Sequence, residues 1–584
     1  MYLTLAAQTV EILGMDLGTV LALLMFVVFM GLILTGYNVA YCFAAVALGF
    51  AFIADMANVI SIRTFDPGVL GGQLPANWQD SLTSQVLLAV PLFVMMGAIL
   101  ERSGLAERLL NAIGLLMGSL RGGVAGAVII VGTLLAAATG VTAATVIVMG
   151  LLSLPAMVKL GYDHKIASGA IVASGTLAQL LPPSIVLILL SNEFGVPIFS
   201  MFAGAMLPGF MLALMYVLYV LIAALLKPEL GPAMPLEDRQ IKGKPSIRSA
   251  AIIGLILSAM VFVTMLLVNL QVAIIAAVVV GVLSFILIAT LGMLAAEVLV
   301  SIIPVVVLIM GVLLSIFQGV APPSESGAVG VFGALVLSAF NYVFDKLLHA
   351  DGNTDIDPRW RMNWDAIKAA ASSTANITIL VMTLLMASLF FRLMFQALGG
   401  ADQVADWLSS IPGGKVGFVL IAMIAVFLLG INLEFLEITY IVVPIFIPAM
   451  DLLEFTEPEK VWFAVLMAVN LNMAFISPPV GFSLFYLQSV APPEVKTSDI
   501  HKGALPFMGL QILALIILGV IPGITYFSYC MFHPNPSEQT CDPNSNGPLY
   551  FYLAVGAIIV AVIGFAVIKS VLGRKSAPEI VRSA

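Results

Sequence analysis

The sequence predicts an all-α polytopic membrane protein, and three observations carry that prediction. Of its 584 residues, 61% are apolar and only 10% are charged, whereas about a quarter of the residues in soluble domains are charged. Uncharged runs such as 17–54 and 249–296 are longer than the roughly 20 residues that cross a bilayer as a helix. The third observation is a pair of interruptions in the apolar pattern, one in each half of the chain.

Each interruption combines small or polar residues with a Pro-Pro pair. In a bilayer every backbone N–H and C=O needs a partner, so unwound chain survives at membrane depth only where it lines a cavity or is buried in protein. Matched interruptions in two halves therefore indicate a transport site built from helical hairpins and broken helices. The first interruption contains Thr139, Gly140, Thr142, Pro182, Pro183 and Ser184, and the second contains Gly430, Glu434, Asn470, Asn472, Ser477, Pro478 and Pro479.

The positions of Lys and Arg predict the orientation of the chain in the membrane. The first 19 residues include Glu11 and Asp16 but no Lys or Arg, which favours an outside N-terminus. A basic tail that includes Arg574 follows the last apolar run, 549–568, which favours a cytoplasmic C-terminus. The net charge of −8 adds little, because orientation depends on where the basic residues lie.

Polar linkers and repeated motifs divide the chain into five expected regions, and we infer that the two repeats among them are inverted. The helix pair near 250–291 carries no polar interruption, which predicts a scaffold or lipid-facing role. In the outside loop, Cys530 and Cys541 leave a disulfide open as an alternative to free thiols. The regions are 1–84, N-terminal scaffold helices; 85–228, a first repeat with a hairpin and a Pro-Pro broken helix; 229–291, a polar linker and the extra helix pair; 292–530, a second repeat of the same kind; and 531–584, an outside loop, a terminal helix and a cytoplasmic tail.

The interruptions supply the groups that bind a small hard cation. Freed carbonyls and the hydroxyls of Thr or Ser replace the hydration shell of an ion such as sodium. The alternative is that Gly, Thr and Ser only allow close packing between helices. The matched pair of patterns favours two sodium sites. The first would use Thr139, Gly140, Thr142, Ala178, Leu181 and Pro183; the second would use Gly430, Ala474, Ser477 and Val480; and Pro182, Pro478 and Pro479 would help to shape the substrate or coupling site.

Acidic residues inside apolar runs need partners or water, because burying a charge in the membrane is costly. Glu434 follows the expected hairpin tip at Gly430. Three roles stay open for it: it binds or orients a cation, it takes a proton, or it caps the helix that follows. Glu325 follows a Pro-Pro-Ser sequence, where a carboxylate in the first turn of a helix has a structural role.

Motifs of the common enzyme classes are missing from the sequence. It contains no HExxH, GxSxG or Walker A pattern, and its four His are scattered near connectors. We therefore expect no enzymatic activity, no cofactor and no nucleic-acid partner. Energy for uphill movement would come from an ion gradient, with sodium as the coupling ion.

The interrupted motifs resemble one family of transporters. The chain is similar to the large membrane (M) subunit of the tripartite ATP-independent periplasmic (TRAP) transporters, part of the wider ion transporter superfamily. The motifs cover most of 20–228 and 292–525. They are Val90-Pro-Leu-Phe-Val-Met-Met-Gly, Ala138-Thr-Gly-Val-Thr-Ala-Ala-Thr, Pro155-Ala-Met-Val-Lys-Leu-Gly-Tyr, Gly175-Thr-Leu-Ala-Gln-Leu-Leu-Pro-Pro-Ser-Ile, Pro322-Pro-Ser-Glu, Gly430-Ile-Asn-Leu-Glu, Pro444-Ile-Phe-Ile-Pro and Ser477-Pro-Pro-Val-Gly-Phe.

The resemblance implies a secondary active transporter of the bacterial inner membrane. Such subunits import an organic anion, usually a carboxylate, by sodium symport, and they receive it from a periplasmic substrate-binding protein (P). A small four-helix membrane subunit (Q) would accompany this chain as a separate protein. The family's elevator mechanism would divide the fold into a fixed scaffold and a moving transport domain. The family's two sodium sites fall on the tips and Pro-Pro breaks chosen above.

The chain departs from the family pattern at several of these positions. Thr139 and Thr142 stand where Ser is common, and Ser477 stands where Thr is common, so the hydroxyl is kept. Ala178 and Ala474 replace Gly, and Glu434 replaces Asp. The alternative function is a receptor-independent sodium/dicarboxylate symporter or anion exchanger of the same superfamily. The sequence does not name the substrate.

Overall fold

The computed structural model describes residues 11–12, 15–57, 59–60, 72–235, 245–348 and 362–532. Apart from the two-residue strands β1 (Glu11–Ile12) and β2 (Met15–Asp16), which pair with each other, the regular elements of these ranges are helices. The expected terminal helix at 549–568, the cytoplasmic tail and Cys541 lie outside the described residues. Cys530 is disulfide-bonded, and Cys42 is buried as a free thiol.

The N-terminal helices begin at residues that cap them. Asp16 accepts a hydrogen bond from the backbone of Thr19 at the start of α1, and Asn38 does the same for Ala40 at the start of α2. Such side chains satisfy backbone donors that a helix leaves unpaired. The three helices of this region are α1 (Leu17–Leu34), α2 (Val39–Met56) and α3 (Leu74–Thr83).

The same order of helical elements occurs twice, so the predicted hairpins and broken helices are present. In both halves a long helix gives way to a short one at a glycine with positive φ: Gly104 at 74° and Gly399 at 79°. The inversion of the two halves and the domain boundaries stay predictions. The first half comprises α4 (Gln85–Arg102), α5 (Leu105–Met117), the hairpin α6 (Gly123–Thr139) and α7 (Thr142–Lys159), the broken helix α8 (His164–Thr176), η2 (Leu177–Gln179) and α9 (Ile185–Phe194), and α10 (Ile198–Leu226). The second comprises α15 (Trp364–Ala397), α16 (Gly400–Ser409), the hairpin α17 (Lys415–Gly430) and α18 (Phe435–Leu452), the broken helix α19 (Glu457–Phe475) and α20 (Phe482–Val490), and α21 (Thr497–Val520).

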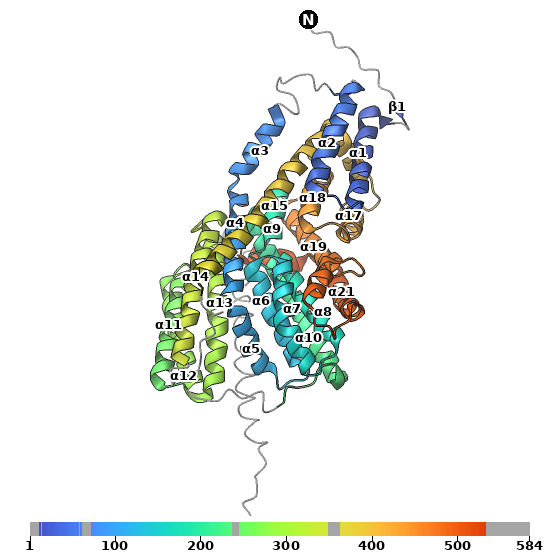
Figure 1. The fold of residues 1–584 in the computed structure, drawn as a ribbon. Helices are drawn as coiled ribbons and strands as arrows, with labels where there is room; N and C mark the ends of the chain where they lie inside the picture. Colours follow the sequence, from blue (N-terminus) through green and yellow to red (C-terminus); the bar gives the residue numbers. More distant parts are fainter. Residues whose placement is uncertain are drawn as a thin grey trace, which may run out of the picture.

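The helices within 247–348 lie together on one side of the molecule (Figure 1), and they pack on α4 and α5 of the first half. The expected extra pair is present as α11 and α12, and it packs on α13 and α14. These helices share a small core that includes Ile253, Leu257 and Val300. Glu325 lies in the first turn of α14, as expected. The remaining elements are η3 (Pro228–Leu230), α11 (Ile247–Met265), α12 (Leu270–Leu291), α13 (Met293–Phe317), α14 (Pro323–Leu348) and α22 (Gly523–Phe532).

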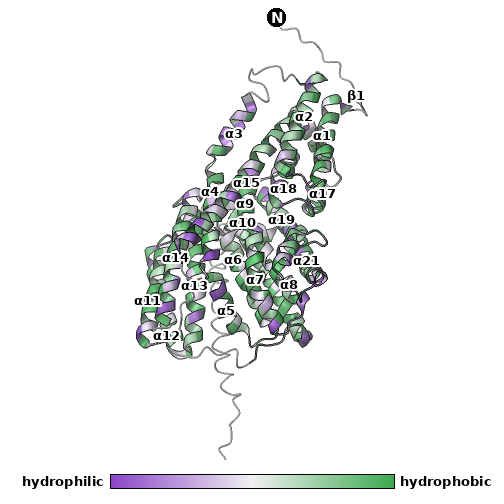
Figure 2. Ribbon diagram, viewed as in Figure 1, coloured by the Kyte–Doolittle hydropathy of each residue, from purple (hydrophilic) through white to green (hydrophobic). Residues whose placement is uncertain are grey.

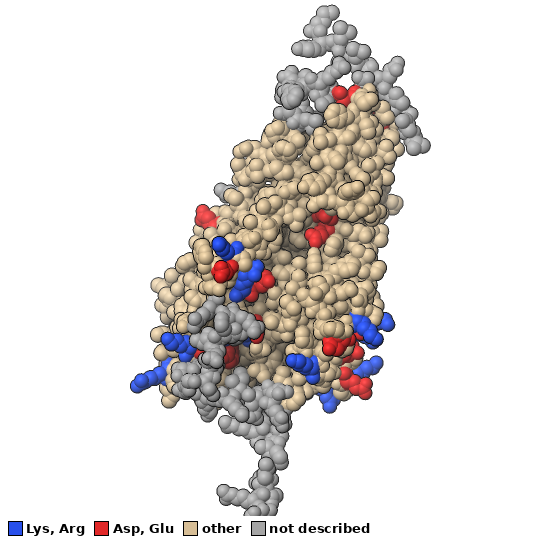
Figure 3. Space-filling view, viewed as in Figure 1, with Lys and Arg blue, Asp and Glu red and all other residues tan. Residues whose placement is uncertain are grey.

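The surface fits a membrane environment. Among the described residues, 11 helices are long and apolar enough to cross a bilayer, and hydrophobic residues dominate the ribbon of Figure 2. On the face shown in Figure 3, the Lys and Arg side chains lie from the middle of the view downward, while the described residues near the N-terminus show only acidic charges. This asymmetry supports the expected outside position of the N-terminus.

Close packing between the two halves places the breaks near each other. Helix α8 packs on α21, and α19 contacts both η2 and α9. A Cβ atom on Gly169 of α8 would lie 2.3 Å from the carbonyl oxygen of Gly503 of α21. Only glycine allows two helix backbones to come this close, so this pair fixes the contact between the halves.

Candidate functional site

The tip of the first hairpin lies against the first helix break. The hairpin turns at Gly140, which follows α6 with a φ of 63°. A Cβ atom on Gly140 would lie 3.4 Å from the carbonyl oxygen of Pro183 and 3.3 Å from Cγ1 of Ile185. The positive φ and the close approach both favour glycine here. The structure therefore brings Gly140 and Pro183 together, while their role as sodium ligands stays a prediction.

The first break contains carbonyl groups that have no hydrogen-bond partner. Between the end of α8 and the start of α9 come η2, which contains Ala178, and residues 180–184, all of them buried. No donor within the described part of the chain reaches the carbonyl oxygens of Leu180, Leu181, Pro182 or Pro183. Buried carbonyls without partners are rare because they cost free energy. A bound cation would replace the missing donors.

Thr139 and Thr142, the two threonines predicted for sodium site 1, differ in their hydrogen bonds. The hydroxyl oxygens of Thr139 and Thr145 lie 2.9 Å apart and share a hydrogen bond. The hydroxyl of Thr142 is buried and has no partner among the described residues. Of the two hydroxyls predicted for sodium site 1, that of Thr142 is therefore the one that can bind a cation without losing an existing hydrogen bond.

The second hairpin also meets its break, but the second break is more open. Gly430 ends α17, and a Cβ atom on it would lie only 2.7 Å from the Cβ of Ala474 in α19. The carbonyl of Ser477 accepts a 2.8 Å hydrogen bond from the backbone of Gly481, so this carbonyl is already engaged. Ser477 is buried, Pro478 and Val480 are half-buried, and Pro479 is exposed. Both Pro-Pro bonds, 182–183 and 478–479, are cis.

Glu434 holds the tip of the second hairpin in place. It precedes α18 and forms a capping box with Glu437, whose Oε2 accepts a 2.9 Å hydrogen bond from the backbone of Glu434. The hydroxyl of Tyr486 donates to Oε1 of Glu434, also at 2.9 Å. Capping, one of the three roles left open by the sequence, is therefore confirmed. Because Tyr486 belongs to α20, the same carboxylate joins the tip to the far half of the broken helix.

Both hairpins and both breaks lie in a region that matches a single family. Residues 26–524 match the family described as "Tripartite ATP-independent periplasmic transporter, DctM component". The chain belongs to this family. It is 25% identical over 473 residues to the C4-dicarboxylate TRAP transporter large permease protein DctM of Pseudomonas aeruginosa, with 80% of this chain and 92% of the relative covered.

Two further proteins are similar to this chain. The chain is 24% identical over 488 residues to the isethionate TRAP transporter permease protein DctMQ of Oleidesulfovibrio alaskensis, with 83% of this chain and 63% of the relative covered. Among solved structures, the YdaH transporter of Alcanivorax borkumensis aligns with a TM-score of 0.48 and 16% identity, covering 87% of this chain and 98% of that one. The DctM-family chain is thus the large membrane subunit of a TRAP transporter. It is a multi-pass protein of the inner membrane and a transport protein rather than an enzyme.

The breaks of this DctM-family subunit contain buried polar side chains that are not among the residues predicted for the sodium or substrate sites. Both amide atoms of Gln179 in η2 and both of Asn472 in α19 are buried without hydrogen-bond partners among the described residues. Because η2 contacts α19, these amides belong to elements that pack together. Gln179 lies three residues before the Pro-Pro pair. A polar residue so close to a predicted helix break was the one feature of the sequence that could have identified it as a site residue.

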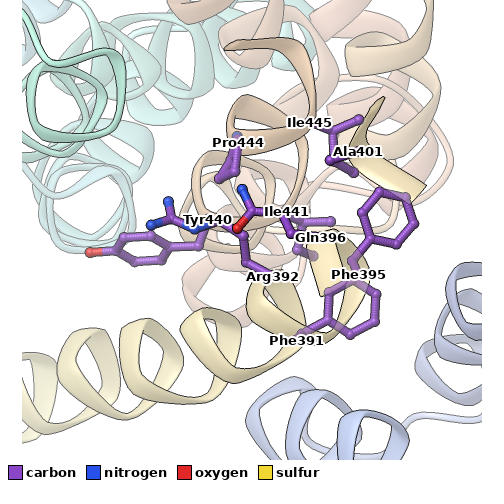
Figure 4. Close-up of a pocket in the computed structure, with 9 residues that line it drawn as sticks. All are labelled: Phe391, Arg392, Phe395, Gln396, Ala401, Tyr440, Ile441, Pro444 and Ile445. Atoms are coloured by element: carbon purple, nitrogen blue, oxygen red, sulfur yellow. The ribbon is translucent and has the colours of Figure 1, made fainter. Parts of the chain in front are cut away.

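An ion pair of this DctM-family subunit, between Glu193 and Arg392, was not predicted from the sequence. Nη1 of Arg392 in α15 donates to Oε2 of Glu193 at the end of α9, over 3.2 Å. Two small pockets adjoin this pair, and both are lined by Arg392 and Tyr440 (Figure 4). The ion pair could not be foreseen, because the two residues are 199 positions apart in sequence.

Proposed function

We propose that this subunit carries out sodium-coupled import of an organic anion, most often a carboxylate, delivered by a periplasmic substrate-binding protein. One observation carries the proposal. Twice in the chain, a hairpin tip that ends in glycine touches a break in a membrane helix: Gly140 at Pro183 and Gly430 at Ala474. Paired breaks of this kind are where secondary transporters bind substrate and coupling ions near the middle of the bilayer.

The unpartnered groups of the first break support sodium as the coupling ion. Carbonyls at 180–183 and the hydroxyl of Thr142 are all oxygen ligands, and they are buried without hydrogen bonds from described residues. Sodium is a hard cation that prefers such ligands. Ala178 and Leu181 would contribute through the backbone, since their side chains offer no ligand atom. Gly430, Ala474, Ser477 and Val480 would form the second site.

The relatives support the class of cargo and the partners. One is named for C4-dicarboxylates and another for isethionate, and both kinds of molecule are small organic anions. The name DctMQ and the partial coverage of that relative support a small membrane subunit as a partner. A fixed scaffold and a moving transport domain that contains both hairpins would carry the cargo by an elevator mechanism.

Reconstituted vesicles test the proposal. The subunit would be inserted with its small membrane partner, and the purified binding protein loaded with succinate or isethionate would be added outside. We expect labelled anion to accumulate only with an inward sodium gradient and only with the binding protein. Accumulation without the binding protein would favour the receptor-independent alternative, and passage without a gradient would contradict coupled transport.

A substitution at the second break tests the role of Ser477. We expect Ser477→Ala to raise the sodium concentration for half-maximal uptake several-fold while expression stays unchanged, because the variant removes a hydroxyl ligand and little volume. Ser489→Ala is the matched control, since Ser489 is exposed and bonds only to the backbone of its own helix. A sodium titration of Ser477→Ala that overlays the wild type would remove Ser477 from the site.

A further inference from the structure

The pair formed by Glu193 and Arg392 joins helices from the two halves at a buried position. Glu193 lies in the last turn of α9, the helix that follows the first break, and its side chain is 5% exposed, whereas that of Arg392 is 32% exposed. The other carboxylate oxygen of Glu193 accepts a 3.4 Å hydrogen bond from the amide of Asn192. An ion pair in such surroundings is costly to form unless its geometry is good.

The hydrogen bonding of Arg392 is incomplete. A guanidinium has five N–H donors arranged as a fork that matches a carboxylate with two parallel bonds. Within the described ranges, only Nη1 donates to a protein acceptor, through the single bond to Glu193. Arg392 also lines both of the small pockets. Arg392 can therefore hold a second carboxylate oxygen.

Neighbouring side chains add further donors to the same place. The hydroxyl of Tyr440 on α18 is buried and has no partner among the described residues. Gln396 lies one helical turn after Arg392 and lines the larger pocket with it, and Figure 4 shows the guanidinium of Arg392 beside the ring of Tyr440. The hydroxyl of Ser388, which also lines the second pocket, already donates to the carbonyl of Leu385. Arg392, Gln396 and Tyr440 have donors left, which suits an anion.

We propose that Arg392, with Tyr440 and Gln396, is a binding site for a carboxylate or sulfonate group of the cargo, and that Glu193 occupies Arg392 until the cargo displaces it. This inference rests on the proposed function and specifies where the anion binds. The larger pocket has about 10 Å³ of free space, which is about one water molecule. The carboxylate of Glu193 thus marks the position that the anionic group of the cargo would take.

Displacement would link cargo binding to movement. While Glu193 holds Arg392, helix α9 is tied to α15 across the boundary between the first and second halves. A cargo anion that takes over Arg392 releases α9 and the break before it. The same step provides selectivity, because a neutral molecule offers no anion to replace Glu193 on the guanidinium.

Uptake and binding measurements on three variants test this site. In vesicles, we expect Arg392→Gln to raise the KM for succinate by about tenfold or more, the size of one charge-assisted interaction, with the sodium dependence unchanged. Glu193→Gln should lower the KM, because Arg392 loses its competitor. The variant that carries both substitutions should keep the high KM of Arg392→Gln. Lys415→Gln with Glu459→Gln, which removes an ion pair elsewhere in the second half, is the control and should leave the KM within twofold.

A simple ion lock gives a different result. If Glu193 and Arg392 only hold helices together, Arg392→Gln and Glu193→Gln break the same contact and would shift the KM in the same direction, and that outcome would overturn the proposal. Stabilisation of the purified, detergent-solubilised subunit by succinate or isethionate gives a readout that needs no transport. We expect each anion to raise the Tm of the wild type and not of Arg392→Gln, with Arg392→Lys between them.

The two assays separate the failure of this site from failure of the proposed function. Uptake that requires sodium and the binding protein but has the same KM in Arg392→Gln would refute the Arg392 site alone. Stabilisation of the wild type that is lost in Arg392→Gln, without sodium-driven uptake, would keep the site and refute sodium coupling. Equal stabilisation of wild type and Arg392→Gln, or none of either, would also refute the site.

Discussion

At the scale of single residues, the site depends on buried polar groups whose partners come from distant segments. Tyr486 donates to Glu434 from a position 52 residues further along the chain, and Glu434 also caps the helix that begins at the hairpin tip. A capping residue was one of the readings that the sequence allowed, because an acidic residue before a helix with Glu three positions later is a known N-terminal pattern. The partner Tyr486 carried no such signal.

Tyr486→Phe tests this contact. We expect the variant to lose about 1.5–3 kcal/mol of unfolding free energy, because it removes a hydrogen bond to an acidic group and leaves the carboxyl of Glu434 buried with fewer partners. Equilibrium unfolding in mixed micelles would measure the loss. Tyr37→Phe, at a residue that is 68% exposed, should be neutral. A stability equal to that of the Tyr37 variant would show that the Glu434 contact contributes nothing.

At the scale of elements, the sequence predicted which hairpins and broken helices form better than it predicted how other helices pack around them. Glycine, proline and hydroxyl residues inside apolar runs predicted both hairpins and both broken helices, because such residues interrupt helices in recognisable ways. The contacts of Gly140 with Pro183 and of Gly430 with Ala474 were also expected, since tips and breaks had to share a cavity. The difference between a buried first break and a more open second break was not expected, because burial of the first break depends on packing from α6, α7 and α19.

Gly140→Ala tests the contact between tip and break. Alanine costs about 1–2 kcal/mol at a positive φ, and its Cβ would press on Pro183 and Ile185. We expect a several-fold rise in the sodium concentration for half-maximal uptake, besides a lower Tm. Gly36→Ala separates these effects, because Gly36 has a φ of 85° and open space around its Cβ position. If both variants change sodium dependence equally, backbone strain rather than contact at the tip is responsible.

At the scale of the whole molecule, the chain combines a duplicated set of helices with one added pair, α11 and α12. The two halves share the contacts that build the site, whereas α11 and α12 pack only on each other and on α13 and α14 among their principal described contacts. The sequence predicted their peripheral place from the lack of polar interruptions. It could not predict the pair of Glu193 and Arg392, because ion pairs between distant segments leave no local pattern.

Removal of residues 246–292 tests whether the added pair takes part in transport. The deletion removes two spans, so the helices that follow keep their orientation, and the newly exposed face of α13 is apolar enough for lipid. We expect the shortened protein to insert into the membrane. Its rate of sodium-driven uptake should stay within about twofold of the wild-type rate, a difference well below the tenfold change that corresponds to about 1.4 kcal/mol.

A point substitution keeps this test decisive if the shortened protein does not fold. A Cβ atom on Gly254 would lie 3.1 Å from the carbonyl oxygen of Gly281, so Gly254→Leu would push α12 away from α11 without touching either break. Uptake by this variant should match the wild type. Loss of uptake in a correctly inserted, monodisperse Gly254→Leu protein would mean that the α11–α12 pair couples to the moving helices, because no direct contact of Gly254 with the hairpins could explain it.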